Sequence, residues 1–157
     1  MPRRKSKRRR RDLNVYYVVE IENWDWSYSF GLDELRYRDE PYREFRHLTL
    51  TGKLLRPGNL KADGVEVTLM PDARLKEETR KRDEPRAVGS LISSGGHLQV
   101  VLSFPSEALE PILQTLIAGK LHYVTIDGSP LHYRQGLVKH FRLESSYDPA
   151  ELPPETK

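Results

Sequence analysis

Residues 15–30 read VYYVVEIENWDWSYSF, a stretch in which large apolar residues recur at every second position. This period is that of a β-strand with one buried and one exposed face. In the first half, one face carries four apolar residues: Val15, Tyr17, Val19 and Ile21. In the second half, one face carries four aromatic residues: Trp24, Trp26, Tyr28 and Phe30. A single strand over residues 14–30 would be about 55 Å long, so we expect a turn or a β-bulge near Asn23.

The aromatic row has two interpretations. Four large rings on one side of a strand usually belong to the core, because leaving them all exposed creates an aggregation-prone patch. This is the interpretation that we favour. The alternative is a platform on which unpaired bases stack, at about 1–3 kcal/mol per base.

The rest of the chain continues the strand pattern. Further strands bounded by turn residues are predicted at about 45–55, 65–69, 87–92, 97–104, 120–126, 131–134 and 137–145. One convincing helix is predicted at about 106–118, where five apolar residues share a stripe: Leu109, Ile112, Leu113, Leu116 and Ile117. We therefore expect a mainly β fold with a minor α component. It is either an antiparallel β-sandwich or a partly open barrel of about eight strands, with this one amphipathic helix.

The ends of the predicted helix carry their own signals. Ser106 is a plausible N-cap and Gly119 a plausible C-cap. Pro111 conflicts with a start at Ser106, because an interior proline removes a hydrogen bond. If Pro111 is instead the first helical position, residues 106–109 form only a preceding turn.

The two ends of the chain differ in composition from the body. Eight of the nine residues from Arg3 to Arg11 are lysine or arginine. The chain has 26 basic and 23 acidic residues, a formal charge of +3; without those eight, residues 12–157 have 18 against 23, or −5. We expect residues 1–12 to form a disordered basic arm and residues 13–146 a single β-rich domain. Residues 147–157, with three prolines and no periodicity, are expected to form a disordered tail.

The basic arm is the leading candidate for binding nucleic acid. Each Lys or Arg that neutralises a phosphate releases condensed counterions, and arginine also binds phosphate through two hydrogen bonds. The candidate residues are Arg3, Arg4, Lys5, Lys7, Arg8, Arg9, Arg10 and Arg11. Such contacts do not select a sequence, because phosphate contacts position a protein and base contacts specify. The alternatives are an acidic protein partner, a localisation signal or a solubilising extension.

Two charged loops, residues 33–46 and 74–86, are the candidates for selecting a protein partner. Arginine and tyrosine are both favoured at interfaces with proteins and nucleic acids. The candidate residues are Arg36, Tyr37, Arg38, Tyr42 and Arg43 in the first loop and Arg80, Lys81 and Arg82 in the second. Acidic residues alternate with these basic ones, so a solvated loop without a partner is the default interpretation.

Local signatures of catalysis or metal binding are missing from the sequence. The lack of cysteine excludes disulfides, thiolate zinc sites and a cysteine nucleophile. The histidines have spacings that match no metal-binding motif, although two of them, His122 and His132, could meet across a hairpin at Asp127-Gly128. The five are His47, His97, His122, His132 and His140. We therefore expect no enzymatic activity, no cofactor and no metal site.

These observations lead to two hypotheses about function. The first is a small non-enzymatic binding protein whose arm contacts RNA or DNA while the β-domain docks on a partner or a nucleoprotein complex. The alternative is a protein–protein interaction or assembly module, such as an adaptor, inhibitor or structural subunit, whose arm binds an acidic protein. We expect no membrane span and a cytoplasmic location, or a nuclear one in a eukaryote, because the apolar stretch after the arm is short and interrupted.

Overall fold

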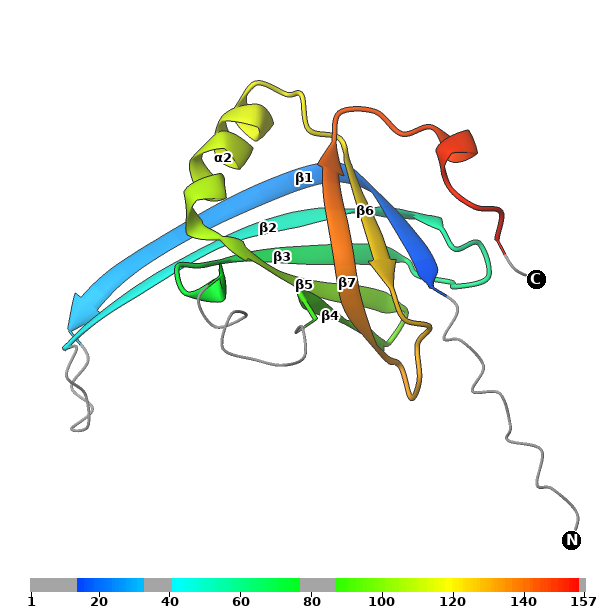
Figure 1. Ribbon diagram of the computed structural model, residues 1–157, viewed down its shortest axis with the longest axis horizontal. Coiled ribbons are helices and arrows are strands. Elements are labelled where there is room, and N and C mark those ends of the chain that lie inside the picture. Colours follow the sequence, from blue (N-terminus) through cyan, green and yellow to red (C-terminus); the bar gives the residue numbers. More distant parts are fainter. Residues whose placement is uncertain (1–13, 33–40, 77–86, 156–157) are drawn as a thin grey trace, which may run out of the picture.

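The structure is a computed structural model that describes residues 14–32, 41–76 and 87–155 (Figure 1). The strands are β1 (Val15–Leu32), β2 (Tyr42–Arg56), β3 (Gly64–Asp72), β4 (Gly89–Ser94), β5 (His97–Pro105), β6 (Tyr123–Gly128) and β7 (Gln135–Glu144). The helices are the 3-10 turn η1 (Ser106–Ala108), α2 (Leu109–Ile117) and the 3-10 turn η2 (Pro149–Glu151). The predominance of strands, with one α-helix in the described residues, confirms the mainly β class predicted from the periodicity.

The strands close into a barrel in the order β1-β2-β3-β5-β4-β7-β6. The ring closes where residues 15–20 of β1 pair with β6. All neighbouring strands are antiparallel except β3 and β5, which are parallel. This pair corrects the expectation of a purely antiparallel sheet. The long charged connection between β3 and β4 lets β4 skip a position, so that β5 lies beside β3.

Alternate residues of β2, β3 and β5 fill much of the barrel interior. Leu48 and Leu50 of β2 are fully buried, as are Val100 and Leu102 of β5. Each buried leucine contributes about 1.5–3 kcal/mol through the area that it removes from water. The period of two that is visible in the sequence therefore identifies the side chains of the core.

The helical segment begins later than a cap at Ser106 implies. Residues 106–108 form η1, and α2 starts at Leu109 without a side-chain cap. Instead, the Arg46 guanidinium donates a hydrogen bond to Ser106 Oγ at 3.2 Å. Pro111 is the third residue of α2, where a backbone N–H has no intrahelical partner to lose. The proline is thus compatible with a helix that starts only two residues before it.

The predicted C-cap of the helix is confirmed. Gly119 has a φ of 66°, and its N–H donates to Leu116 O at 2.9 Å while Lys120 N–H donates to Thr115 O at 3.0 Å. This pair of bonds is the Schellman arrangement that favours glycine. The apolar stripe also faces the core, with one exception: Ile117 is 72% exposed.

The strand predicted at 131–134 is instead part of the turn between β6 and β7. Tyr133 and Arg134 have positive φ values of 50° and 65°, and His132 forms only an isolated bridge with Gln135. At the other end of this hairpin, His122 N–H donates to Glu144 O at 3.0 Å. The two histidines therefore lie at opposite ends of the hairpin, so His122 and His132 do not meet across it.

Strand β1 runs well beyond the barrel. It is one strand of 18 residues, with register shifts against β2 at Val18/Val19 and Ile21/Asn23, which confirms a bulge near Asn23. Beyond the residues that pair with β6 and β3, residues 27–32 and 42–47 pair only with each other. We call these two segments the ribbon. Figure 1 shows it projecting from one end of the barrel, far from the point where β1 begins.

Gly52 allows the close approach of β1 and β2 at the bulge. A Cβ atom at this position would lie 2.0 Å from Glu20 O, which belongs to the barrel backbone. Gly52→Ala is therefore expected to lower the free energy of unfolding by about 2 kcal/mol. Gly31→Ala, in the same pair of strands, is the control, because a Cβ atom there meets nothing within 4 Å. Urea unfolding of both variants tests this, and equal midpoints would contradict the close approach.

Candidate functional site

The aromatic row predicted for the core lies largely on the ribbon and its base. Trp24 packs against the core, but Trp26, Tyr28 and Phe30 are 39%, 53% and 61% exposed. The favoured interpretation is thus wrong for three of the four rings. The apolar residues of β1 keep their period of two beyond the barrel, although no other described part of the barrel covers them there.

One face of the ribbon forms an apolar strip. The register places Leu32 opposite Tyr42 and Tyr28 opposite Arg46, so these side chains point to the same side as Phe30. Phe30 and Tyr42 stack with ring centroids 5.5 Å apart, and Trp26 and Tyr28 stack at 6.4 Å. We call this strip the aromatic face; its members are Trp26, Tyr28, Phe30, Leu32 and Tyr42.

Polar side chains hold the base of the aromatic face. Arg46 Nε lies 3.2 Å from Glu44 Oε1, and the same guanidinium donates to Ser106 in η1. On the other face of the ribbon, the rings of Phe45 and His47 meet edge to face at 5.3 Å. The ribbon is therefore fastened to the barrel through Arg46.

The charge of the hairpin differs in sign from that of the arm. Residues 24–50 contain six acidic and four basic residues, a formal charge of −2. The arm carries eight basic residues and no acidic one between Arg3 and Arg11. Residues 33–40, which lie outside the described residues, account for −2 of the charge of the hairpin, and the charged residues of the ribbon itself are Arg43, Glu44 and Arg46.

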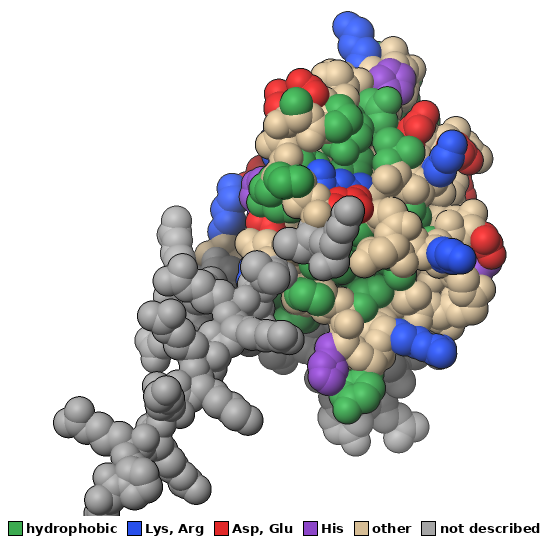
Figure 2. All heavy atoms as spheres, turned by 90° about the vertical axis from the view of Figure 1, so that its right-hand side faces the viewer, with side chains coloured by type: hydrophobic (Ala, Val, Ile, Leu, Met, Phe, Trp, Pro, Cys, Tyr) green, Lys and Arg blue, Asp and Glu red, His purple; other side chains and the backbone are tan. Residues whose placement is uncertain are grey.

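A cavity of about 680 Å³, which we call the end cavity, lies at the other end of the molecule, where β1 begins. Its lining comes from four segments: residues 14–17, the turn after β2, the turn between β6 and β7, and residues 153–155. Apolar side chains, including Tyr17, Leu60 and Leu131, make up much of this lining. Figure 2 faces this end of the molecule and shows hydrophobic side chains gathered around a few charged ones.

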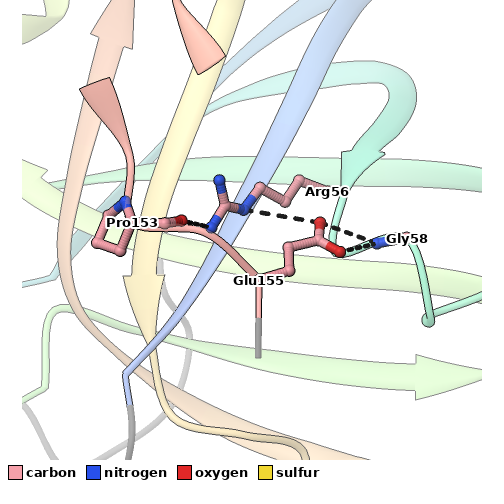
Figure 3. A network of polar contacts seen from close by, with 4 residues as sticks. All are labelled: Arg56, Gly58, Pro153 and Glu155. Carbon is pink, nitrogen blue, oxygen red and sulfur yellow. Dashed lines mark hydrogen bonds and ion pairs between the residues drawn. The ribbon is translucent and has the colours of Figure 1, made fainter. Parts of the chain in front are cut away.

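Arg56 fastens the C-terminal segment beside this cavity (Figure 3). Its side chain is 11% exposed, and its Nε lies 3.7 Å from Glu155 Oε1. Arg56 also donates a hydrogen bond to Pro153 O. The Gly58 N–H donates to both carboxylate oxygens of Glu155, at 3.1 and 3.2 Å. Two residues of β2 and its turn therefore bind one carboxylate and one carbonyl of the segment.

These contacts correct the expectation that residues 147–157 form a disordered tail. Asp148 Oδ1 accepts a hydrogen bond from Ala150 N–H at 2.9 Å and so caps η2. Leu152 is buried, with 8% of its surface exposed. Ordering of residues 147–155 depends on partners in the barrel that are distant in sequence. Residues 156–157 lie outside the described residues.

Tyr17 lies at the floor of the cavity and is buried. Its hydroxyl donates a hydrogen bond to Ser129 O at 2.9 Å, and burial raises its pKa to about 12. Ionising the folded form is unfavourable because the phenolate would lose its hydration.

The pKa of Tyr17 predicts a loss of stability at high pH. In the unfolded chain a tyrosine ionises near its ordinary value of about 10, whereas folded Tyr17 stays neutral up to about 12. The unfolded state loses its proton first, so stability falls as pH rises from about 10 to about 12, by on the order of 2 kcal/mol. Tyr17→Phe should remove this part of the decline and cost about 1 kcal/mol at neutral pH. Urea unfolding at several pH values measures both, and identical alkaline slopes would contradict the assignment.

Few of the residues that the sequence nominated lie in the described part of the chain. Tyr42, in the aromatic face, is 60% exposed, and Arg43 lies beside it on β2. The remaining candidates are outside the described residues: Arg3, Arg4, Lys5, Lys7, Arg8, Arg9, Arg10, Arg11, Arg36, Tyr37, Arg38, Arg80, Lys81 and Arg82. Among the described residues of the predicted set, Tyr42 and Arg43 are neighbours on β2 whose side chains point to opposite faces of the ribbon.

Other residues of these sites were not predicted. The exposure of the aromatic row had one available signal, since an alternating run of 16 residues exceeds the usual strand length of about 3–10 residues. The contact between Arg56 and Glu155 has no local signal, because the two are far apart in sequence. Within residues 14–32, 41–76 and 87–155, no group of His, Asp and Glu is arranged to hold a metal ion.

Two further observations concern membrane spans and known proteins. Among the described helices, none is long and apolar enough to cross a membrane. Comparison with known protein families, with curated proteins and with solved structures finds no match to this chain.

Proposed function

We propose that this chain is a small non-enzymatic binding protein with two separate binding ends. At one end the basic arm contacts RNA or DNA, and at the other the aromatic face of the ribbon docks on a protein partner. The observation that carries the proposal is the course of β1. This strand of 18 residues starts directly after the arm and ends at the ribbon, a distance of up to about 60 Å.

The composition of the ribbon favours a protein partner over a nucleic acid. The aromatic face combines three types of aromatic ring with Leu32, and large aromatic side chains are the usual anchors of protein interfaces. The hairpin of residues 24–50 has a formal charge of −2. A phosphate backbone would gain little counterion release from this hairpin, because its basic residues are outnumbered by acidic ones. The stacked rings therefore support docking on protein better than stacking on bases.

The arm supports a polyanionic partner for the opposite reason. It concentrates eight cations in nine residues, whereas residues 12–157 together carry −5. A nucleic acid would be attracted to the arm and repelled by much of the body. Six of the eight cations are arginine, whose planar fork binds phosphate through two hydrogen bonds.

The alternative function is an assembly module in which the arm binds an acidic protein. Nuclease treatment separates the two proposals. The tagged full-length chain is captured from extracts of its native cells, with and without nuclease, beside one variant that lacks the arm and one with an altered aromatic face. If the proposal is right, removal of the arm releases the nucleic acid and alteration of the aromatic face releases a protein that resists nuclease. Retention of an acidic protein through the arm after nuclease would support the alternative.

A further inference from the structure

Residues 152–155, Leu-Pro-Pro-Glu, already bind to the barrel as a short peptide, and the last three of them line the end cavity. Leu152 is buried, the carbonyl of Pro153 accepts a hydrogen bond from Arg56, and the carboxylate of Glu155 accepts from Gly58. The barrel thus binds an apolar side chain, a backbone carbonyl and a carboxylate in one short extended segment. These are three different recognition elements for a peptide.

The carboxylate contact is a built site. Arg56 is 9% exposed, so its cation is held within the protein rather than on a flexible surface side chain. The backbone N–H of Gly58 lies 3.1 and 3.2 Å from the two Glu155 oxygens. The Gly58 N–H thus donates charge-assisted hydrogen bonds to the carboxylate, which are stronger than neutral ones, and Arg56 adds an ion pair at 3.7 Å.

The segment leaves much of the site open. Pro153, Pro154 and Glu155 form only one wall of the cavity of about 680 Å³. The other walls include Tyr16, Tyr17 and prolines from two turns. Grooves lined by aromatic residues and proline bind extended proline-containing segments, because such segments lose little conformational entropy on binding.

The composition of the basic arm adds charge complementarity. Asn14 and Val15 line the cavity, and residues 3–11, which carry eight cations, precede them closely in the sequence. A peptide with further acidic residues next to the bound carboxylate would gain attraction to the arm. We propose that the end cavity binds an extended, proline-containing acidic peptide of a protein partner, and that residues 152–155 occupy part of this site in its absence. This site is distinct from the ribbon and from the nucleic-acid contacts of the arm.

The test uses the full-length chain labelled with ¹⁵N and a blocked synthetic peptide with the sequence of residues 150–157, AELPPETK. Glu155→Ala removes the carboxylate of the chain's own segment. The peptide should then bind at least about tenfold more tightly than to the unaltered chain, because the competing segment no longer occupies the site. The amide resonance of Gly58 should move in Glu155→Ala and return toward its original position when the peptide is added.

Two control peptides separate the site from the arm. A peptide with glutamine at the position of Glu155 should bind at least about tenfold more weakly, since it lacks the charge-assisted bonds. A scrambled peptide of the same composition should bind no better than this, whereas binding to the arm alone would be indifferent to order. Arg56→Gln, combined with Glu155→Ala, should remove the binding.

The inference is overturned if Glu155→Ala moves the Gly58 resonance without any gain in peptide affinity, or if the scrambled peptide binds equally well. In either case, residues 152–155 have only a structural role, in which they stabilise the barrel. If the Gly58 resonance does not move in Glu155→Ala, Gly58 does not bind the Glu155 carboxylate in solution, and the inference also fails. Glu155→Lys, which puts a like charge beside Arg56, is a second variant. Its peptide affinity and its response to the scrambled peptide are judged in the same way.

Discussion

Deletion of residues 2–11 should lower the affinity of the chain for RNA or DNA at least about a thousandfold in about 50 mM salt, without lowering the melting temperature. The deletion removes eight cations, and each phosphate that the arm no longer neutralises keeps its condensed counterions. For single strands, the slope of log K against log salt should change from about −6 toward zero. Fluorescence anisotropy with a labelled oligonucleotide, measured over a range of salt concentrations, gives both quantities.

A matched variant shows whether charge alone carries this effect. Replacing the six arginines of the arm with lysine keeps the formal charge of the chain at +3. The slope of log K against log salt should be retained. The affinity should fall only modestly, because lysine neither forms two parallel hydrogen bonds to one phosphate nor stacks on bases. Unchanged nucleic-acid affinity after deletion of residues 2–11 would refute the role proposed for the arm.

The core of the barrel was predictable because burial and strand period are linked. Val65, Val67 and Leu69 alternate in the sequence, and all three are buried. The bulge near Asn23 followed from the length of the run, and the cap at Gly119 followed from the special backbone conformation that glycine adopts without strain. These features depend on residues that are close in sequence.

The features that were not predicted depend on distant partners. The period of β1 is the same in its buried half and in the ribbon, because alternation reports which side chains share a face and not what covers that face. The parallel pairing of β3 and β5 depends on the place of β4 in the strand order, which no local pattern of the sequence indicates. Likewise, the order of residues 152–155 depends on Arg56, which lies about a hundred positions earlier in the chain.

The second large effect concerns the aromatic face. Replacing Tyr28 and Phe30 with threonine should weaken docking of the protein partner on the order of a thousandfold, since buried aromatic anchors contribute at least about 2 kcal/mol each. Stability should change little, because these side chains are 53% and 61% exposed and threonine keeps the preference for a strand. Recovery of the partner after nuclease treatment measures docking, and urea unfolding measures stability.

Threonine at Val101 and Leu137 provides the control for this pair. Both residues lie in strands of the barrel, β5 and β7, and are 41% and 57% exposed, so the control removes exposed apolar surface without altering the aromatic face. Equal loss of the partner in both double variants would show that docking depends on general surface hydrophobicity and would contradict the proposed site.

The oligomeric state of the double variant Tyr28→Thr with Phe30→Thr decides what the aromatic face binds. An exposed apolar strip on a two-stranded ribbon is prone to pair with another copy. Glu44 and Arg46 lie opposite Phe30 and Tyr28, and together with Arg43 they place charges along β2 that oppose uncontrolled pairing of this edge. If sedimentation shows that the chain is an oligomer and that Tyr28→Thr with Phe30→Thr makes it a monomer, then the protein bound by the ribbon is a second copy of the chain. If both forms are monomers, the ribbon is left for a different protein, and loss of that protein from the variant follows directly from loss of the two rings.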